Sequence, residues 1–207
     1  MKNGLLLFLG AFAALGLSWA GLALGTNAQL GHLAPYFDQL ENRALPDRAP
    51  GIAERGKLVY EDLGCAACHT QAVRRPGFGS DTERKWGDRQ SYARDYIHQD
   101  RIQLGLSRVG PDLTNVGARL KSADEVFKLL YHGTTTMPPY AFLFEEHPAE
   151  AQPSPKAVDK VGGREIVPTP RAEVLAAYLL SLNTPADYPV EKAVNTIAPA
   201  KKEAEHK

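Results

Sequence analysis

The chain has 207 residues, of which 24 are basic and 24 are acidic, so its formal net charge at neutral pH is zero. This length suffices for one domain with a core and an anchor or tail, but not for two large domains. The even balance of charge argues against nucleic acid, or any strongly charged surface, as the main partner. Function must therefore be sought in local motifs.

The N-terminal stretch is apolar enough to cross a membrane. No charged residue occurs from Gly4 to Gly25, and as a helix this stretch spans about 31–33 Å, which matches the hydrocarbon core of a bilayer. The alternatives are a buried core helix, which seldom runs this far without a polar face, and a cleaved signal peptide with Lys2 as its positive end. The run exceeds the roughly 7–15 apolar residues of an ordinary signal peptide. We therefore expect residues 1–26 to form a retained transmembrane anchor.

The rest of the chain divides by composition. Residues 27–50 are polar and contain three prolines, which is typical of a linker. Residues 51–183 are expected to form one domain with two insertions, at about 71–109 and 145–168. The tail, residues 184–207, is rich in Pro, Ala, Lys and Glu, which predicts a mobile or partner-bound segment.

Periodicity and end signals predict that the domain is mainly α-helical. "GIAERGKLVYEDLG" places Ile52, Leu58 or Val59, and Leu63 on one helical face, and Gly64 ends this helix.

A second helix is predicted from Ser122 as N-cap to Gly133 as its end, with Glu125 at the capping-box position. Within the later insertion, "AVDKVGGREIV" favours a Gly-Gly hairpin. The last predicted helix, "RAEVLAAYLLSL", has an apolar stripe formed by Val174, Leu175, Tyr178, Leu179 and Leu182.

The first insertion, from Gln71 to Val109, has no clean helical or strand period and is rich in arginine. A solvated surface loop is the simplest interpretation. However, an excursion of this length that carries Trp86, Tyr92 and Tyr96 also suggests that it covers a buried group or a partner.

Both cysteines lie in "GCAACHT", as Cys65 and Cys68, with His69 directly after them. A disulfide between them would close only a tiny loop. A structural zinc site would have to recruit two distant histidines, and a thioredoxin-like dithiol expects a βαβ context. Cys-x-x-Cys-His is instead the pattern of c-type haem attachment, since two thiols one turn apart can add to the two vinyl groups of a porphyrin. We predict one covalently bound haem c with His69 as an axial iron ligand.

The second axial ligand is predicted from the remaining candidates. Apart from the initiator, Met137 is the only methionine. A lone methionine is often core filler, but this one lies in a proline-stiffened loop, "TTTMPPY", ahead of the last helix. His132 is the alternative, although its place fits an exposed helix end beside the C-terminal dipole. We therefore predict Met137 as the second ligand.

The order of these segments resembles that of class I cytochromes c: helix, Cys-x-x-Cys-His, "GPDL", helix, Met-Pro loop, final helix. The resemblance implies that the Pro111 carbonyl accepts a hydrogen bond from Nδ1 of His69, which orients the imidazole. It also implies that Gly56 and Tyr60 on the first helix cross against Tyr178 on the last, the glycine allowing close approach.

Four blocks, "CHTQAVRRP", "DTERKWGDRQS", "LSRVGPDLTNVGAR" and "MPPYAFL", resemble the membrane-anchored monohaem subunit (FixO/CcoO type) of cbb3-type cytochrome c oxidases. The resemblance implies a single-pass protein of the bacterial inner membrane with its haem domain on the periplasmic side. Its partners would be a catalytic haem-copper subunit and other cytochrome c subunits. Residues expected near the haem propionates or the catalytic subunit are Trp86, Arg74, Arg75 and Arg108.

The predicted ligand set implies electron transfer, because a His/Met haem has no open coordination position for a substrate. The chain would then pass electrons to the catalytic subunit that reduces oxygen, without being catalytic alone. Two alternatives share the same anchor and haem: the cytochrome c subunit of nitric oxide reductase, and a free-standing membrane-anchored electron shuttle.

Overall fold

The computed structural model describes residues 3–148 and 154–184, and it is mainly helical, as predicted. The described chain forms two units. The first comprises residues 3–46 and 92–97, and the second the other described residues. Of the predicted tail, residues 185–207 lie outside the described part, as do residues 149–153 of the later insertion.

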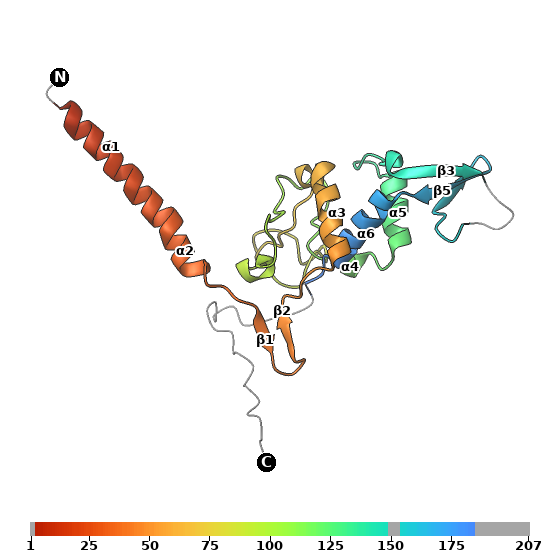
Figure 1. Ribbon diagram of the computed structural model, residues 1–207, viewed down its shortest axis with the longest axis horizontal. Helices are drawn as coiled ribbons and strands as arrows, with labels where there is room; N and C mark the ends of the chain where they lie inside the picture. Colours follow the sequence, from red (N-terminus) through yellow and green to blue (C-terminus); the bar gives the residue numbers. More distant parts are fainter. Residues whose placement is uncertain (1–2, 149–153, 185–207) are drawn as a thin grey trace, which may run out of the picture. The chain divides into compact units, whose positions relative to one another are not determined.

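The first unit begins with one long apolar helix (Figure 1). It consists of α1 (Gly4–Trp19), a π-helical turn η1 (Ala20–Leu24) and α2 (Gly25–Leu30). The 27 residues are long and apolar enough to cross a membrane, because they span about 40 Å at 1.5 Å per residue. No side chain of this helix is buried against the described chain. The helix continues four residues beyond the predicted end of the anchor.

The predicted linker contains a small antiparallel hairpin. Its strands are β1 (Tyr36–Asp38) and β2 (Arg43–Leu45). The Asp38 carboxylate accepts the backbone N–H of Leu40 at 2.8 Å, and Asn42 adopts a positive φ of 53°. An Asp side chain that accepts backbone N–H groups and an Asn with a positive φ are both typical of turns. The hairpin was not predicted from the sequence, although both residues are visible there.

The core of the second unit forms where α3 (Gly51–Asp62) crosses α6 (Pro170–Ser181). A Cβ atom on Gly56 would lie 1.9 Å from the carbonyl oxygen of Val174, so only glycine permits this approach. Next to the crossing, the rings of Tyr60 and Tyr178 meet edge to face with centroids 5.3 Å apart. The helix crossing implied by the class I resemblance is therefore confirmed.

The inner face of α3 agrees in part with the predicted one. Of the residues placed on one face, Val59 is buried and Leu63 packs against the core. Ile52 is 45% exposed, so its place on this face was wrong, and Leu58, the alternative to Val59, is 62% exposed. The contact through Gly56 sets the rotation of the helix, and the stripe that faces the core consists of Ala53, Gly56, Lys57, Val59 and Tyr60.

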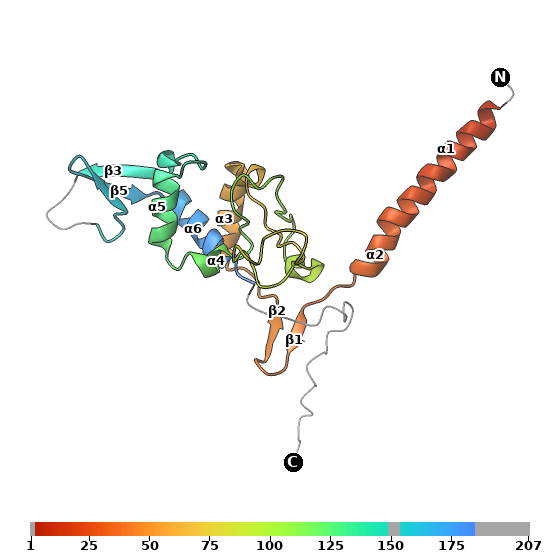
Figure 2. The same cartoon turned by 180° about the vertical axis from the view of Figure 1, so that it is seen from behind.

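Two further helices pack on α6, namely α4 (Val116–Arg119) and α5 (Ala123–His132). In both views α6 lies between α3 and α5 (Figures 1 and 2). The predicted N-cap of α5 is confirmed, since the Ser122 hydroxyl accepts the N–H of Glu125 at 3.2 Å. The Glu125 carboxylate accepts the N–H of Lys121 at 3.0 Å, one residue before the cap.

The later insertion forms a three-stranded antiparallel sheet of order β3-β5-β4. Its strands are β3 (Phe144–Pro148), β4 (Asp159–Val161) and β5 (Arg164–Pro168). Gly162 and Gly163 connect β4 to β5 with positive φ angles, which confirms the predicted Gly-Gly hairpin. Within residues 3–148 and 154–184, three short 3-10 turns complete the secondary structure: η2 (Cys65–Ala67), η3 (Ala93–Tyr96) and η4 (Ala141–Leu143).

Candidate functional site

The Cys-x-x-Cys-His motif forms one tight turn after α3. Gly64 ends the helix with a φ of 68°, and the carbonyl of Cys65 then accepts the N–H groups of Cys68 at 3.1 Å and His69 at 3.0 Å. Both thiols are free. Cys65 is half-buried against the core, and this burial raises the pKa of its thiol to about 11, whereas Cys68 is exposed.

The end of the long excursion returns to this motif and runs beside it. Segment 104–113 makes four backbone hydrogen bonds with segment 66–71, at 2.8–3.1 Å. The donor and acceptor pairs are Gln71 to Leu104, Leu106 to Ala66, Gly110 to Cys68 and Leu113 to Thr70. The excursion therefore holds the motif in place, although the two segments are some forty residues apart.

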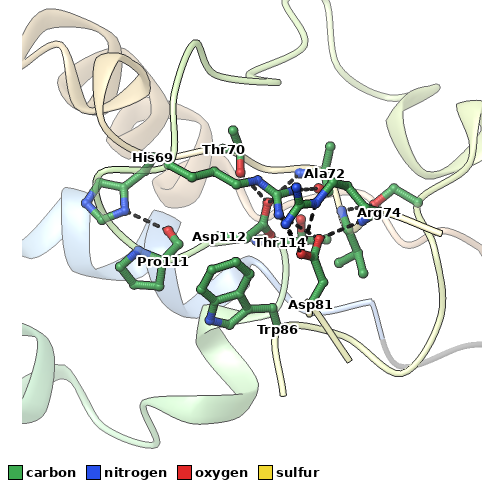
Figure 3. Close-up of polar contacts among 12 residues, drawn as sticks. His69, Thr70, Ala72, Arg74, Asp81, Trp86, Pro111, Asp112 and Thr114 are labelled. Atoms are coloured by element: carbon green, nitrogen blue, oxygen red, sulfur yellow. Dashed lines mark hydrogen bonds and ion pairs between the residues drawn. The ribbon is translucent and has the colours of Figure 1, made fainter. Parts of the chain in front are cut away.

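The His69 ring is fixed from two sides. Its Nδ1 lies 2.8 Å from the carbonyl oxygen of Pro111, as Figure 3 shows, so the contact implied by the resemblance is present. A Cβ atom on Gly110 would lie 2.2–2.8 Å from three atoms of the ring, so the backbone packs directly on the imidazole. With Nδ1 donating to this carbonyl, Nε2 retains the lone pair that can bind a metal.

The loop that carries Met137 is held by its own backbone. Gly133 ends α5 with a φ of 68°. The N–H of Thr134 donates to the Met137 carbonyl at 2.8 Å, and the N–H of Met137 donates to the Thr134 hydroxyl at 3.0 Å. A further hydrogen bond, from the Tyr140 N–H to the Leu130 carbonyl at 2.7 Å, ties the loop to α5.

Met137 packs against the same core as the motif. Met137, Cys65 and Tyr140 all contact the main hydrophobic cluster. Burial, and then the nearby thiols of Cys65 and Cys68, raise the pKa of Tyr140. The structure thus brings the Met137 loop close to the cysteines. His132, the alternative ligand, instead places its Nε2 2.9 Å from the Asp159 carboxylate.

Arg74 and Arg108 converge on one buried carboxylate, Asp81. The Asp81 side chain is 1% exposed and accepts the Arg74 N–H at 2.7 Å, Arg74 Nη2 at 2.8 Å and Arg108 Nη1 at 2.6 Å. Burial alone would raise the pKa of Asp81, but the hydrogen bonds from the two arginines outweigh it and hold this pKa well below its usual range. Asp81 is therefore a buried carboxylate whose charge is stabilised by hydrogen bonds and ion pairs within the protein.

The two other residues predicted in the excursion, Trp86 and Arg75, have different surroundings. Trp86 is buried, with the guanidinium of Arg108 5.5 Å from its ring centroid, so it belongs to the group around Asp81. Arg75 lies apart from that group and stacks over the ring of Phe78 at 4.3 Å. The expected role of these side chains at the haem propionates stays a prediction.

A second buried carboxylate, Asp112, follows Pro111 directly. It is fully buried and accepts the Thr70 hydroxyl at 2.6 Å, the Ala72 N–H at 2.9 Å and the Thr114 N–H at 2.8 Å. These bonds join the "GPDL" turn to the residues that follow His69, and they fix both segments at the point where the imidazole meets the Pro111 carbonyl.

Comparison with protein families identifies the group to which this chain is related. Residues 49–172, more than half of the chain, match the family described as "Cytochrome C oxidase, mono-heme subunit/FixO". The chain belongs to this family. The resemblance to the monohaem subunit of cbb3-type oxidases is thereby confirmed, in preference to the nitric oxide reductase subunit. A search of curated proteins found no match.

The FixO family description implies one haem, and the residues present fit that group. Two free thiols precede an imidazole whose Nδ1 is engaged, and a thioether lies in a nearby loop. Over residues 3–148 and 154–184, no three His, Cys, Asp or Glu side chains gather as a metal-binding group.

Three positions of the site were missed in the sequence: Asp81, Gly110 and Asp112. The "GPDL" turn contained the last two, but only Pro111 was assigned a role. Asp81 offered a weaker signal, as an acidic residue in an arginine-rich stretch. Pairing it with Arg108 requires knowledge of a contact across 27 residues.

Replacing Asp81 with asparagine should lower the free energy of unfolding at pH 7 by up to about 3–5 kcal/mol, because Arg108 would lose the nearer of its two buried counter-charges. The folded-state pKa of Asp81 is depressed, so its contribution is complete above the unfolded value of about 4 and is lost as the pH falls through the folded value. The difference between wild type and Asp81→Asn should therefore shrink below about pH 4. Urea unfolding at pH 7, 5 and 3 measures it.

Asp88→Asn is the matched control, since Asp88 is an exposed carboxylate of the same excursion. It should change the unfolding free energy at pH 7 by less than about 0.5 kcal/mol. A difference for Asp81→Asn that stays constant down to pH 3 would contradict the assignment.

Proposed function

We propose that this chain is the electron-transfer subunit of a respiratory terminal oxidase. It carries one covalent haem c with His69 and Met137 as axial ligands, and it passes electrons to a catalytic haem-copper subunit that reduces oxygen. Membership of the FixO family supports a place in the oxidase complex. The observation that carries the haem assignment is the 2.8 Å contact between Nδ1 of His69 and the Pro111 carbonyl, which leaves Nε2 for iron.

Each proposed haem-binding residue has a separate task. Cys65 and Cys68 would hold the haem covalently, each thiol giving its sulfur to one carbon of a vinyl group and its hydrogen to the other carbon. No oxidant is consumed in this addition. His69 and Met137 fill the axial positions and exclude substrates from the iron. When bound, the haem supplies a one-electron ferric/ferrous couple, and methionine ligation raises its potential.

The long N-terminal helix, Gly4–Leu30, would hold the domain at the membrane surface. We place the haem domain on the periplasmic side of the bacterial inner membrane. Lys2, the one charge before the apolar run, gives a small preference for an N-terminus in the cytoplasm. This placement suits a subunit that receives electrons from other cytochromes c.

The double variant Cys65→Ser/Cys68→Ser should lose covalent haem completely, because serine hydroxyls do not add to the vinyl groups. The wild-type chain, purified from membranes, should show the reduced α-band of a c-type haem and retain it on a denaturing gel stained for haem peroxidase activity. Met137→Ala is the control, since it removes an axial ligand but keeps both thioethers and should stain as strongly as wild type.

A double variant that still stains for haem would overturn the attachment site. The same membrane preparation checks the partner, because the wild-type chain should be isolated with a larger subunit that contains haem b and copper. Isolation of the loaded chain without that subunit would favour a free-standing electron shuttle.

A further inference from the structure

The contact between His69 and Pro111 lies near a cluster of charged side chains around the buried carboxylate of Asp81. We call this group, formed by Asp81, Arg74 and Arg108, the Asp81 cluster; Figure 3 labels Asp81 and Arg74. Arg74 and Asp81 come from the first part of the excursion and Arg108 from its end. The role expected of the two arginines at the haem propionates leaves Asp81 without a task, although its carboxylate binds both of them.

Arg108 is the member that reaches towards the haem motif. Its Nη1 donates to both oxygens of Asp81 at 2.6 and 2.7 Å, and its Nη2 donates to the Ala72 carbonyl at 2.6 Å. The same Nη2 lies 3.6 Å from the Asp112 carboxylate. With its side chain 19% exposed, Arg108 cannot turn into solvent without breaking these contacts.

His69 and Pro111, which share the hydrogen bond described above, are both flanked by residues that Arg108 or Asp112 binds. Pro111 lies between Arg108 and Asp112. His69 is followed by Thr70, whose hydroxyl donates to Asp112 at 2.6 Å, and then by Ala72, whose carbonyl binds Arg108. Movement of the 108–112 segment would therefore move the Pro111 carbonyl relative to the imidazole.

We propose that Asp81 is a positioning residue for His69. Its carboxylate holds Arg108, and through Arg108 the 108–112 segment, so that the Pro111 carbonyl keeps facing Nδ1. This inference rests on the proposed function, because it takes His69 to be an axial ligand. A hydrogen bond to the remote nitrogen of a metal-bound imidazole fixes the ring and increases its basicity.

The two arginines of the cluster should differ in importance. Arg74 is 45% exposed and can be solvated by water if Asp81 loses its charge. Arg108 is mostly buried, and without the Asp81 carboxylate its guanidinium would lose the nearer of its two counter-charges and keep only Asp112, at 3.6 Å. Displacement of Arg108, and not of Arg74, is thus the event that releases the Pro111 carbonyl.

The test measures hydrogen exchange of the His69 Nδ1 proton by NMR on the full-length, haem-loaded chain. In Asp81→Asn this proton should exchange with solvent at least about tenfold faster than in wild type, because its hydrogen bond opens more often. The midpoint potential should shift in the same variant. Arg74→Gln, which leaves the contacts of Arg108 intact, should exchange at nearly the wild-type rate.

Glu165→Gln is the matched control for loss of a buried carboxylate. Glu165 lies in β5, is buried, and accepts the N–H of Ser154 at 2.8 Å. The Glu165→Gln substitution should destabilise the domain without altering the exchange rate of the His69 Nδ1 proton. Equal exchange rates in Asp81→Asn and Glu165→Gln would therefore overturn the positioning role.

If Asp81→Asn loads no haem, Arg108→Lys decides, since lysine keeps the charge near Asp81 but has one nitrogen where Arg108 uses two, Nη1 for Asp81 and Nη2 for the Ala72 carbonyl. Faster exchange in Arg108→Lys supports the inference, and a wild-type rate overturns it. Absence of a c-type spectrum in the wild-type chain would instead refute the proposed function.

Discussion

Replacing Met137 with alanine should lower the midpoint potential of the haem by a substantial part of the ~0.8 V range that axial ligands span. The physical reason is that a thioether ligand favours ferrous iron, and alanine offers no replacement. Spectroelectrochemical titration of the purified chain measures the change. The visible spectrum should at the same time lose the features of a six-coordinate low-spin iron.

His132→Ala is the matched control for this prediction. His132 lies five residues before Met137 at the end of α5, and its ring faces Asp159 at 2.9 Å. Its removal should leave the potential and the spectrum unchanged. If the midpoint potential fell in His132→Ala and stayed constant in Met137→Ala, His132 and not Met137 would be the second iron ligand.

The loop around Met137 explains why the methionine can be held at one place. The positive φ of Gly133 turns the chain out of α5, and a Cβ atom there would lie 2.5 Å from the Met137 carbonyl. Thr134 binds the loop at both its N–H and its hydroxyl. These hydrogen bonds hold the loop in one geometry, which reduces the entropic cost of placing the sulfur.

The attachment motif and both expected ligands could be proposed from the sequence because those signals are local or can be counted. Cys65, Cys68 and His69 lie within five residues of one another, and Met137 is the only methionine after the first residue. The N-cap of α5 and the turn between β4 and β5 could also be predicted, since Ser122 and the Gly162-Gly163 pair have strong local conformational preferences.

The features that escaped prediction depend on contacts between distant segments. No local signal reveals that residues 104–113 pair with residues 66–71, or that Asp81 lies between Arg74 and Arg108. The exposure of Ile52, and the choice between Leu58 and Val59, could not be predicted for the same reason. All three fit a helical period, but a close crossing through Gly56 decides which of them are buried.

Replacing Gly56 with alanine should reduce the free energy of unfolding by about 3 kcal/mol or more, at the upper end of the range for overpacked cores. The new methyl group would lie 1.9 Å from the Val174 carbonyl oxygen and 2.7 Å from Cβ of Tyr178. Because the nearest atoms belong to the backbone of α6, relief requires the two helices to separate. Urea unfolding of the full chain, followed by far-UV circular dichroism, measures the loss.

Gly51→Ala provides a control with the same chemical change in the same helix. A Cβ atom on Gly51 would meet nothing within 4 Å, and alanine is the better helix former by up to about 1 kcal/mol. This variant should therefore be as stable as wild type or slightly more stable. If Gly56→Ala were equally harmless, α3 and α6 could not be as close as the structure places them. The edge-to-face contact of Tyr60 with Tyr178, which depends on the same crossing, would then also be in error.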